Sequence, residues 1–294
     1  KNWFTRMPIW LRAVLAVVLV LVLAVGTAYA YVNSKWDRMG REEIKTDELI
    51  INAEVKEKLD LGDGYTNIAL FGVDSREGNL GAGSRSDCII VASLNNQTKE
   101  IRMVSIYRDT LLNLSDGTYQ KCNAAYSYGG PQMAINMLNM NLDLDIEDYV
   151  TVDFSAIADG IDMLGGIDIE ITEEELKELN YHLVGTAMAI GRESPFVQHA
   201  GMVHLNGMQA TTYARIRSTA GGDFTRTERQ RLVIEKVVEK VKKTDLQTLD
   251  AMINELFSHV STSFTLPEIL MYATAYKEYT LGENTGFPYS DLLS

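Results

Sequence analysis

The sequence predicts an α/β fold: a three-layer α-β-α sandwich with a mixed central sheet, preceded by one N-terminal transmembrane helix. Short apolar runs separated by polar turns, from residue 67 onward, are typical of strands. A strand–helix–strand pattern over residues 148–172 indicates a crossover unit, in which a helix packs on a largely buried sheet. The 294 residues, 46% of them hydrophobic, are enough to bury one sizeable core.

The N-terminal apolar run is the first feature along the chain. Residues 13–32, AVLAVVLVLVLAVGTAYAYV, carry no charge and are about as long as a helix that crosses a bilayer. Basic residues precede this run, so we expect residues 1–12 in the cytoplasm and the domain outside the cytoplasmic membrane. A cleavable signal peptide is the alternative, because AYA at 28–30 is typical of a cleavage site. The length of the run favours an uncleaved, single-pass signal anchor in the cell membrane.

The remaining chain divides by composition. Residues 33–64 mix charges of both signs and lack a dense apolar face, so we interpret them as a juxtamembrane spacer with helical stretches. Residues 65–294 are expected to form one extracytoplasmic domain. Cys88 and Cys122 would lie in an oxidising compartment, where a disulfide is conceivable, although two buried free thiols are the simpler interpretation.

The first half of the domain is predicted to form strands followed by a helix. The apolar runs predict strands at residues 67–73, 88–94 and 101–106, the last two joined as a hairpin by NNQTKE. Pro131 is expected to open a helix, because proline is favoured in the first turn.

The second half begins with the crossover unit. A strand at 148–154, a helix capped by Ser155 and a strand at 165–172 make up this unit. A helix over 206–217 is expected to deliver Arg215 and Arg217 at its C-terminal end.

The next helix is expected to begin at Thr225. The sequence TRTE places Glu228 three residues after this threonine, which is the capping-box pattern. The N-terminus of a helix presents unpaired N–H groups and favours an anion. Arg226 and Gln230 share a face at this end, so the segment predicts an anion site.

Arginine dominates the basic motifs of the domain. Of the ten arginines after residue 64, eight lie in DSR, RSD, YRD, RIR or RTERQR. A guanidinium pairs bidentately with carboxylate or phosphate oxygens and stays ionised, which suits a ligand carrying several oxyanions. Exposed salt bridges on an acidic surface are the alternative, which is favoured for an isolated arginine, whereas the clustering favours an anion site.

Two aspartates accompany these arginines. Asp74 follows one predicted strand and Asp87 precedes the next. A pair of Asp oxygens together with phosphate oxygens is how Mg²⁺ is commonly held, although Asp at strand ends is also common in turns. The sequence therefore predicts a Mg²⁺ site, with Mn²⁺ as an alternative ion.

Other classes of function are disfavoured. G-x-S-x-G, H-E-x-x-H, Walker A and Cys/His zinc spacings are absent from the sequence, so ordinary hydrolase chemistry is unsupported. A net charge of −13 and export from the cytoplasm both oppose nucleic acid as a partner.

Four segments in order resemble the LytR-CpsA-Psr proteins, envelope enzymes of chiefly Gram-positive bacteria. The resemblance covers about residues 66–243. It is carried by NIALFGVDSREGNLGAGSRSDCIIVASLNNQTKEIRMVSIYRDTLL, KCNAAYSYGGP, VDFSAIADGIDMLGGIDIEI and LNGMQATTYARIR…DFTRTERQR.

The resemblance implies a phosphotransferase. Such an enzyme moves a glycopolymer (teichoic acid, capsule polysaccharide or a similar wall polymer) from an undecaprenyl-pyrophosphate carrier to peptidoglycan through a phosphodiester. The prenyl chain would enter an apolar pocket between sheet and helices. Asp74 and Asp87 match the family's Mg²⁺-associated positions, and Arg108 is expected to act with them in catalysis. The positions that match its pyrophosphate contacts are Arg85, Arg108, Lys121, Arg215, Arg217, Arg226 and Gln230.

One departure and two alternatives accompany the resemblance. Tyr107 stands where the family usually has proline, which puts the presentation of Arg108 in doubt. The same site could instead use water, as a polyprenyl-pyrophosphate-saccharide pyrophosphatase. The protein could also be a non-catalytic, membrane-anchored binder of a lipid-linked polymer.

Overall fold

The computed structural model describes residues 34, 40–59, 64–75 and 79–289, and the described residues from 40 onward form one compact unit. The predicted cytoplasmic segment 1–12 and transmembrane helix 13–32 lie outside the described residues. Within the described ranges, no helix combines the length and apolar character needed to cross a bilayer.

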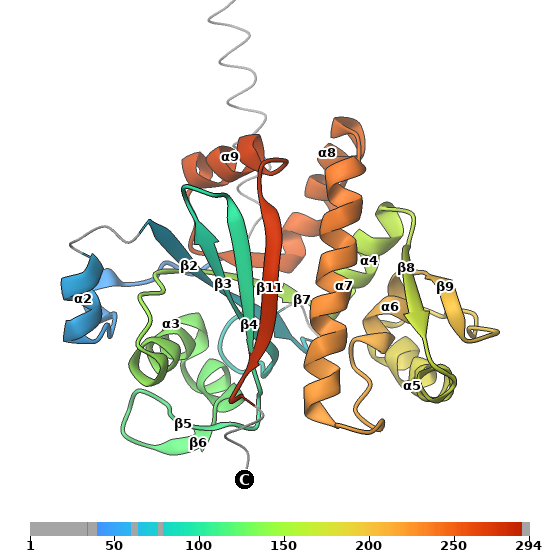
Figure 1. Ribbon diagram of the computed structural model, residues 1–294, viewed down its shortest axis with the longest axis horizontal. Helices are drawn as coiled ribbons and strands as arrows, with labels where there is room; N and C mark the ends of the chain where they lie inside the picture. The colour runs from blue at the N-terminus through green and yellow to red at the C-terminus, as the bar shows by residue number, and fades with distance from the viewer. Residues whose placement is uncertain (1–33, 35–39, 60–63, 76–78, 290–294) are drawn as a thin grey trace, which may run out of the picture. The chain divides into compact units, whose positions relative to one another are not determined.

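A seven-stranded mixed sheet forms the centre of the fold (Figure 1). Its middle is an antiparallel meander of β2, β3 and β4, while β7 runs parallel to β2 and β11 runs parallel to β4. The mixed central sheet predicted from the sequence is thus confirmed. In spatial order the strands are β1 (Gly40–Arg41), β10 (Val260–Thr262), β7 (Asp148–Asp153), β2 (Tyr65–Val73), β3 (Ser86–Asn95), β4 (Glu100–Ile106) and β11 (Thr280–Phe287).

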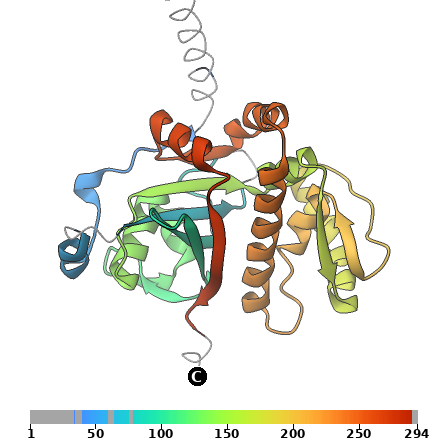
Figure 2. The same cartoon turned by 45° about the horizontal axis from the view of Figure 1, so that its top comes forward.

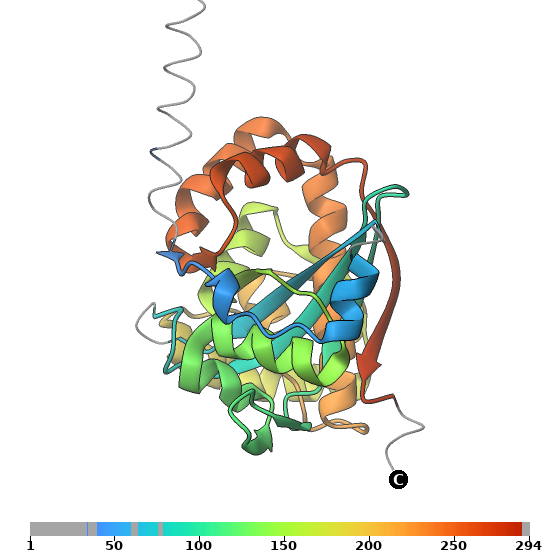
Figure 3. The same cartoon turned by 90° about the vertical axis from the view of Figure 1, so that its left-hand side faces the viewer.

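Helices cover both faces of this sheet (Figure 3). On one face, α3 packs its buried side chains against Phe71, Ile89 and Val91. On the other face, Ile68, Ala92 and Leu94 meet Phe264 and the side chains of α9. Alternate residues of β3 therefore supply two separate cores, as a strand buried on both sides requires. The helices are α2 (Ala53–Leu59), α3 (Asn123–Leu142), α4 (Phe154–Met163), α5 (Glu173–Ile190), α6 (Gly207–Tyr213), α7 (Asp223–Lys243), α8 (Leu246–Leu256) and α9 (Leu266–Ala275), with short 3₁₀ turns at Thr46–Glu48 and Phe257–His259.

The predicted crossover unit is wrong. The strand β8 (Ile167–Ile171) exists, but it pairs antiparallel with β9 (Gly201–Leu205) in a separate two-stranded sheet. Figure 2 shows this two-stranded sheet on the far side of α7 from the central sheet. The alternation Ile-Asp-Ile-Glu-Ile is the reason, because three buried isoleucines alternate with exposed acids and only one face can be buried. A third small sheet joins β5 (Leu111–Asn113) to β6 (Tyr119–Lys121).

Two helix starts also differ from the prediction. Asp153, and not Ser155, caps α4, because its carboxylate accepts a hydrogen bond from the N–H of Ala156 at 2.7 Å. The helix expected from Pro131 is the second half of α3. An additional turn precedes it across a kink at Gly129 and Gly130.

Residues 40–59, expected to be spacer, pack on the domain. Gly40 and Arg41 pair with β10 at the edge of the central sheet. Ile44 is buried in the core beneath α3, and Leu49 packs against that core. This part of the chain therefore adds a strand and apolar contacts to the fold.

Candidate functional site

A polar pocket lies where β2 ends and β3 begins. Because these strands are antiparallel neighbours, Val73 pairs with Ser86 across a bulge, and Asp74 and Asp87 extend from this junction. Arg108 follows the C-terminal end of β4 and joins them. The pocket has a volume of about 590 Å³ and is lined by Asp74, Ser75, Asn79, Gly83, Ser84, Arg85, Asp87 and Arg108.

Arginines from two segments hold these aspartates. Arg108 Nη1 lies 2.6 Å from Asp87 Oδ1, and both side chains are largely buried. Arg217 Nη2 contacts the other oxygen of Asp87 at 3.4 Å. Arg215 Nη2 lies 3.4 Å from Asp74 Oδ2, and its guanidinium stacks 4.6 Å from the ring of Phe154. The segment after α6 is thus tied to the ends of β2 and β3.

The helix expected to deliver these arginines ends earlier than predicted. Its last residue is Tyr213, so Arg215 and Arg217 lie in the following loop. Gly207 lets the start of α6 approach α4 closely, since a Cβ there would lie 1.8 Å from the carbonyl oxygen of Ala158. The N–H of Gly207 also donates to Asp162 Oδ1 at 2.6 Å. These contacts fix α6 and hence the loop.

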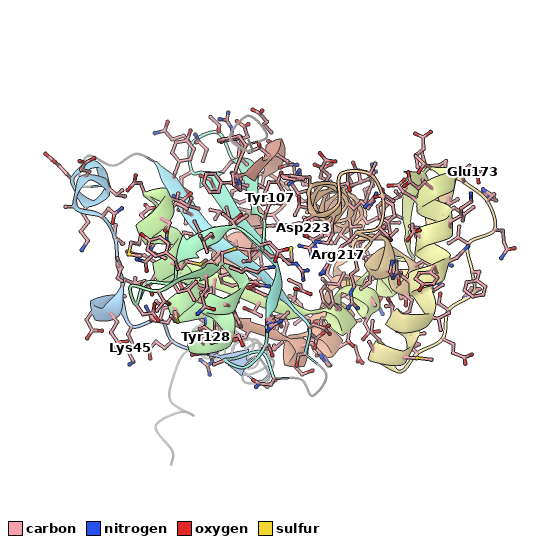
Figure 4. The ribbon with its side chains drawn as sticks, turned by 90° about the horizontal axis from the view of Figure 1, so that it is seen from below. Lys45, Tyr107, Tyr128, Glu173, Arg217 and Asp223 are labelled. Atoms are coloured by element: carbon pink, nitrogen blue, oxygen red, sulfur yellow. The ribbon has the colours of Figure 1, made fainter. Side chains whose placement is uncertain are left out.

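The N-terminus of α7 completes the site. The helix begins at Asp223 instead of the predicted Thr225, and no side chain caps it. Gly221 and Gly222 adopt left-handed φ values of +91° and +54°, a conformation that favours glycine, and this lets the helix start two residues earlier. Figure 4 shows Asp223 and Arg217 close together near the middle of the view, beside Tyr107.

Sequence reasoning did not single out Asp223. Its carboxylate lies 2.9 Å from Arg226 Nη2 and 3.8 Å from Arg108 Nε. An acidic residue immediately after two glycines, at the start of a helix, was the available signal.

Arg226 is the most buried basic group of the site. Its side chain is 2% exposed, and its Nε and Nη1 have no hydrogen-bond partner among the described residues. Burial lowers the pKa of Arg226, and the nearby positive charges of Arg217 and Arg108 lower it further. Burial also lowers the pKa of Arg217, with Arg108 contributing. Buried donors normally have acceptors, so the geometry favours an anionic ligand that supplies the missing oxygens.

Two further arginines of α7 are buried. Arg229 bonds Glu175 Oε1 at 2.8 Å, Thr219 Oγ1 at 2.6 Å and the carbonyl oxygen of Ile216 at 3.1 Å. It therefore holds the loop that carries Arg217. Burial lowers the pKa of Arg231, and its Nη1 has no hydrogen-bond partner among the described residues. The cluster between residues 215 and 231 thus combines ligand-facing and structural side chains.

The remaining predicted residues lie at the margins. Arg85 lines the polar pocket. Lys121, exposed on β6, bonds Asp109 Oδ1 at 2.7 Å and lowers the pKa of that carboxylate. Gln230 is buried and faces an apolar cavity instead of the polar pocket. The structure therefore brings the predicted arginines and aspartates together. Lys121 lies at the exposed edge of this cluster, and Gln230 lies on the side of the apolar cavity.

An apolar channel lies behind the site, between the sheet and the helices α7, α8 and α9. It consists of two adjoining cavities of about 530 and 350 Å³. Both cavities are lined by Leu70, Val150, Ile234, Val238 and Val260. Cys88 and Gln230 lie at one end, and burial raises the pKa of Cys88 to about 12. Cys88 and Cys122 are both free thiols.

The donor set of the polar pocket suits a hard divalent cation in combination with a ligand. No group of three or more His, Cys, Asp or Glu side chains able to hold a metal occurs in the described part of the chain. Asp74 and Asp87 line one pocket and offer carboxylate oxygens, which Mg²⁺ prefers. Phosphate oxygens and water would have to complete the coordination.

Comparison with known proteins identifies relatives. The model of the LytR_cpsA_psr family matches residues 27–283. The polyisoprenyl-teichoic acid–peptidoglycan teichoic acid transferase TagU of Bacillus licheniformis is 29% identical over 274 residues, covering 91% of this chain and 82% of that protein.

Solved structures share the fold. TagT bound to LI-WTA matches with a TM-score of 0.61 at 22% identity, covering 77% of this chain and 79% of that one. The LytR-CPS2A-psr family protein YwtF (TagT) with bound octaprenyl pyrophosphate lipid matches with a TM-score of 0.57 at 20% identity, covering 77% and 78%.

Proposed function

The chain belongs to the LytR_cpsA_psr family and is an enzyme of the transferase class, and from this premise we propose that it moves a glycopolymer from an undecaprenyl-pyrophosphate carrier to peptidoglycan. The observation that carries the proposal is the buried guanidinium of Arg226, two of whose nitrogens lack a hydrogen-bond partner among the described residues, one helical turn before Gln230, which lines the apolar channel. A ligand that suits both features has an oxyanion head and a long apolar tail. A polyprenyl pyrophosphate has that chemistry, and a relative of the same fold is the protein solved with octaprenyl pyrophosphate.

The arginines stabilise charge during the transfer. The acceptor hydroxyl oxygen attacks the phosphorus that carries the saccharide, the bond to the polyprenyl phosphate breaks, and the hydroxyl proton passes to water. Charge spreads over the phosphoryl oxygens in such a transition state, so preorganised cations and alignment supply most of the catalysis. Arg108, Arg217 and Arg226 are the groups placed for this task.

Asp109 is a poor proton acceptor. Its hydrogen bond from Lys121 lowers the pKa of the carboxyl, and the positive charge of Arg108 adds to the shift. A general base works best with a pKa near the operating pH. Asp109 therefore orients Lys121 at the rim.

Asp74 and Asp87 are proposed to hold Mg²⁺, with Mn²⁺ as an alternative. When bound, the ion would polarise the phosphorus and stabilise the departing phosphate. The aspartates otherwise hold Arg215 and Arg217 in place, as their contacts at 3.4 Å indicate.

The proposed location is the outer side of the cytoplasmic membrane. Residues 13–32 would anchor the chain once, residues 1–12 would remain in the cytoplasm, and the domain would meet peptidoglycan outside. The polymer, whether a teichoic acid or a capsule polysaccharide, is set by the donor that the cell provides.

A transfer assay tests the proposal. The full chain is incubated with a polyprenyl-pyrophosphate saccharide and peptidoglycan oligomers, with Mg²⁺ or EDTA, and the glycan is analysed by mass spectrometry. We expect a saccharide phosphodiester on the glycan in the presence of Mg²⁺ only. Free phosphorylated saccharide would assign a pyrophosphatase instead, and an unchanged carrier bound to the protein would assign a binding protein.

A further inference from the structure

The helix α9 carries apolar side chains on two opposite faces. Its inner face, which includes Ile269 and Tyr272, lines the channel. On its outer face, Leu270 and Met271 are 43% and 55% exposed. Glu268 is the one charged residue of the helix, and it is bonded to Thr265 in a capping box. A helix whose outer face meets water normally carries charges there, so this face is suited to an apolar environment.

The first described strand after the predicted anchor pairs with the strand that precedes this helix. Gly40 pairs with Ser261, five residues before α9 begins at Leu266. The predicted span ends at Val32, eight residues before Gly40. At about 3.5 Å per residue, that length reaches at most about 28 Å, whatever conformation it adopts. The predicted anchor would thus limit the distance between the bilayer surface and the sheet edge next to α9 to about 28 Å or less.

The channel ends beneath α9. The arginine cluster lies at the N-terminus of α7, and Gln230 marks the channel end nearest to it. Near the C-terminus of α7, Lys242 lines the other end of the channel and donates a hydrogen bond to the carbonyl oxygen of Tyr279, just beyond α9. Figure 1 shows α9 at the end of α7 opposite its N-terminus. Since 21 helical residues extend about 30 Å, the two ends are well separated.

Exposed apolar side chains also occur on other elements, so exposure alone does not distinguish α9. Met188 on α5 and Met202 on β9 are 80% and 65% exposed, more than Met271. Neither of these residues belongs to an element that lines the channel or adjoins β1. The combination of an apolar outer face, a channel beneath it and the nearby tether is found at α9.

We propose that the outer face of α9, with Leu270 and Met271, rests in the interfacial region of the phospholipid bilayer. The far end of a bound prenyl chain leaves the channel beneath α9 and stays in the bilayer, while its head group remains at the arginines. The path of the prenyl chain rests on the proposed function, whereas the contact of α9 with the bilayer does not.

Fluorescence quenching tests the contact. The full chain is reconstituted in phospholipid vesicles as Met271→Cys or, as a matched control, Met188→Cys, each labelled with a thiol-reactive dye. The unsubstituted chain controls for labelling of the buried Cys88 and Cys122. We expect nitroxide lipids to quench the dye at 271 at least about threefold more than the dye at 188, because only the former lies in the interface. Equal quenching at the two positions overturns the proposed contact.

A charge substitution tests the path of the tail. Leu270→Glu is compared with Val184→Glu, whose native side chain on α5 is 47% exposed, close to the 43% of Leu270. In vesicles with a long-chain donor, we expect Leu270→Glu to lower turnover by about tenfold and Val184→Glu to leave it unchanged, since a charge is costly at a bilayer interface. A short-chain donor in detergent should be used equally well by both variants.

The outcomes separate the two proposals. Equal loss with both donors would assign Leu270 a structural role and overturn the proposed path. Unchanged turnover of Leu270→Glu with the long-chain donor overturns it as well. If the unsubstituted chain transfers nothing, the proposed function fails, and the quenching result still decides whether α9 meets the bilayer.

Discussion

At the scale of single residues, the guanidinium of Arg226 is the strongest indication that the site binds an anion. It is buried and ionised, and two of its nitrogens lack partners among the described residues, although Asp223 lies 2.9 Å away. Burying a charge with incomplete pairing destabilises a fold, so such a group is retained where a ligand completes it. Asp109 and Lys121 differ from Arg226, because both are exposed and they form an ion pair with each other.

Arg226→Met should therefore separate function from stability. Removing one donor to a developing oxyanion typically lowers turnover by about 100-fold or more. The apolar replacement removes the desolvation cost of the guanidinium, and Asp223, which loses its partner at 2.9 Å, keeps Arg108 at 3.8 Å, so the melting temperature should change little. Turnover and thermal unfolding are measured together, with Arg102→Ala, an exposed arginine paired to Glu100, as the control. A large fall in melting temperature would make Arg226 a structural residue.

Asp109→Asn tests the inference that Asp109 is not the general base of the transfer. The low pKa of Asp109 implies that this substitution lowers turnover by less than about tenfold and leaves the pH–rate profile unshifted. A loss of the basic limb of the profile, measured as kcat/KM against pH, would show that Asp109 does accept the proton.

At the scale of elements, the strands of the meander and the helix from Pro131 were predictable because their apolar patterns are local. The partner of β8 was not predictable, since the residues of β9 that pair with it lie 30 to 38 positions farther along the chain. The start of α7 was missed because the freedom of Gly221 and Gly222 outweighed the capping pattern at Thr225. The arginines of the site were recognised from their clustering, but their division into ligand-facing and structural groups needed the positions of Glu175 and Thr219.

Glu175 links α5 to α7 through Arg229. Burial raises the pKa of Glu175, but hydrogen bonds from Thr172 and from Arg229 outweigh this effect and lower it overall. Glu175→Gln should cost about 1–3 kcal/mol of unfolding free energy, because Arg229 loses its charged partner. It should also lower turnover, since Arg229 holds the loop that carries Arg217.

The pH dependence follows from the sign of this shift. A lowered folded-state pKa contributes stability that is present above the unfolded value of about 4.3 and is lost as the pH falls through the folded value. The difference in unfolding free energy between wild type and Glu175→Gln, measured with denaturant, should therefore begin to narrow as the pH falls below about 4.3. A constant difference between the two proteins down to low pH would contradict this origin of the stability.

Tyr107 joins β4, α7 and β11, where the family pattern has proline. Its ring lies 4.4 Å from that of Phe224, edge to face, and a Cβ on Gly286 would lie 2.2 Å from its hydroxyl oxygen. Gly286→Ala should destabilise the fold by about 1–3 kcal/mol, and less in a Tyr107→Ala background. Additive losses in this double-mutant cycle would show that Tyr107 and Gly286 do not share the space.

At the scale of the whole molecule, the apolar channel and the arginine cluster lie at successive positions along α7. The arginine cluster was evident in the sequence, whereas the apolar pocket was expected only from the family resemblance, and their junction at Gln230 and Cys88 became visible only in the fold. The central claim is that one amphiphilic ligand occupies both parts.

The most direct test of that claim is the affinity for a polyprenyl pyrophosphate, measured by titration of wild type, Arg226→Met and Val238→Trp. Val238 lines both cavities, so tryptophan there should fill the channel without touching the arginines. We predict that each variant binds at least about tenfold more weakly, a loss of about 1.4 kcal/mol or more. Wild-type affinity in Val238→Trp, with weak binding confined to Arg226→Met, would contradict the account, because the tail would then lie outside the channel.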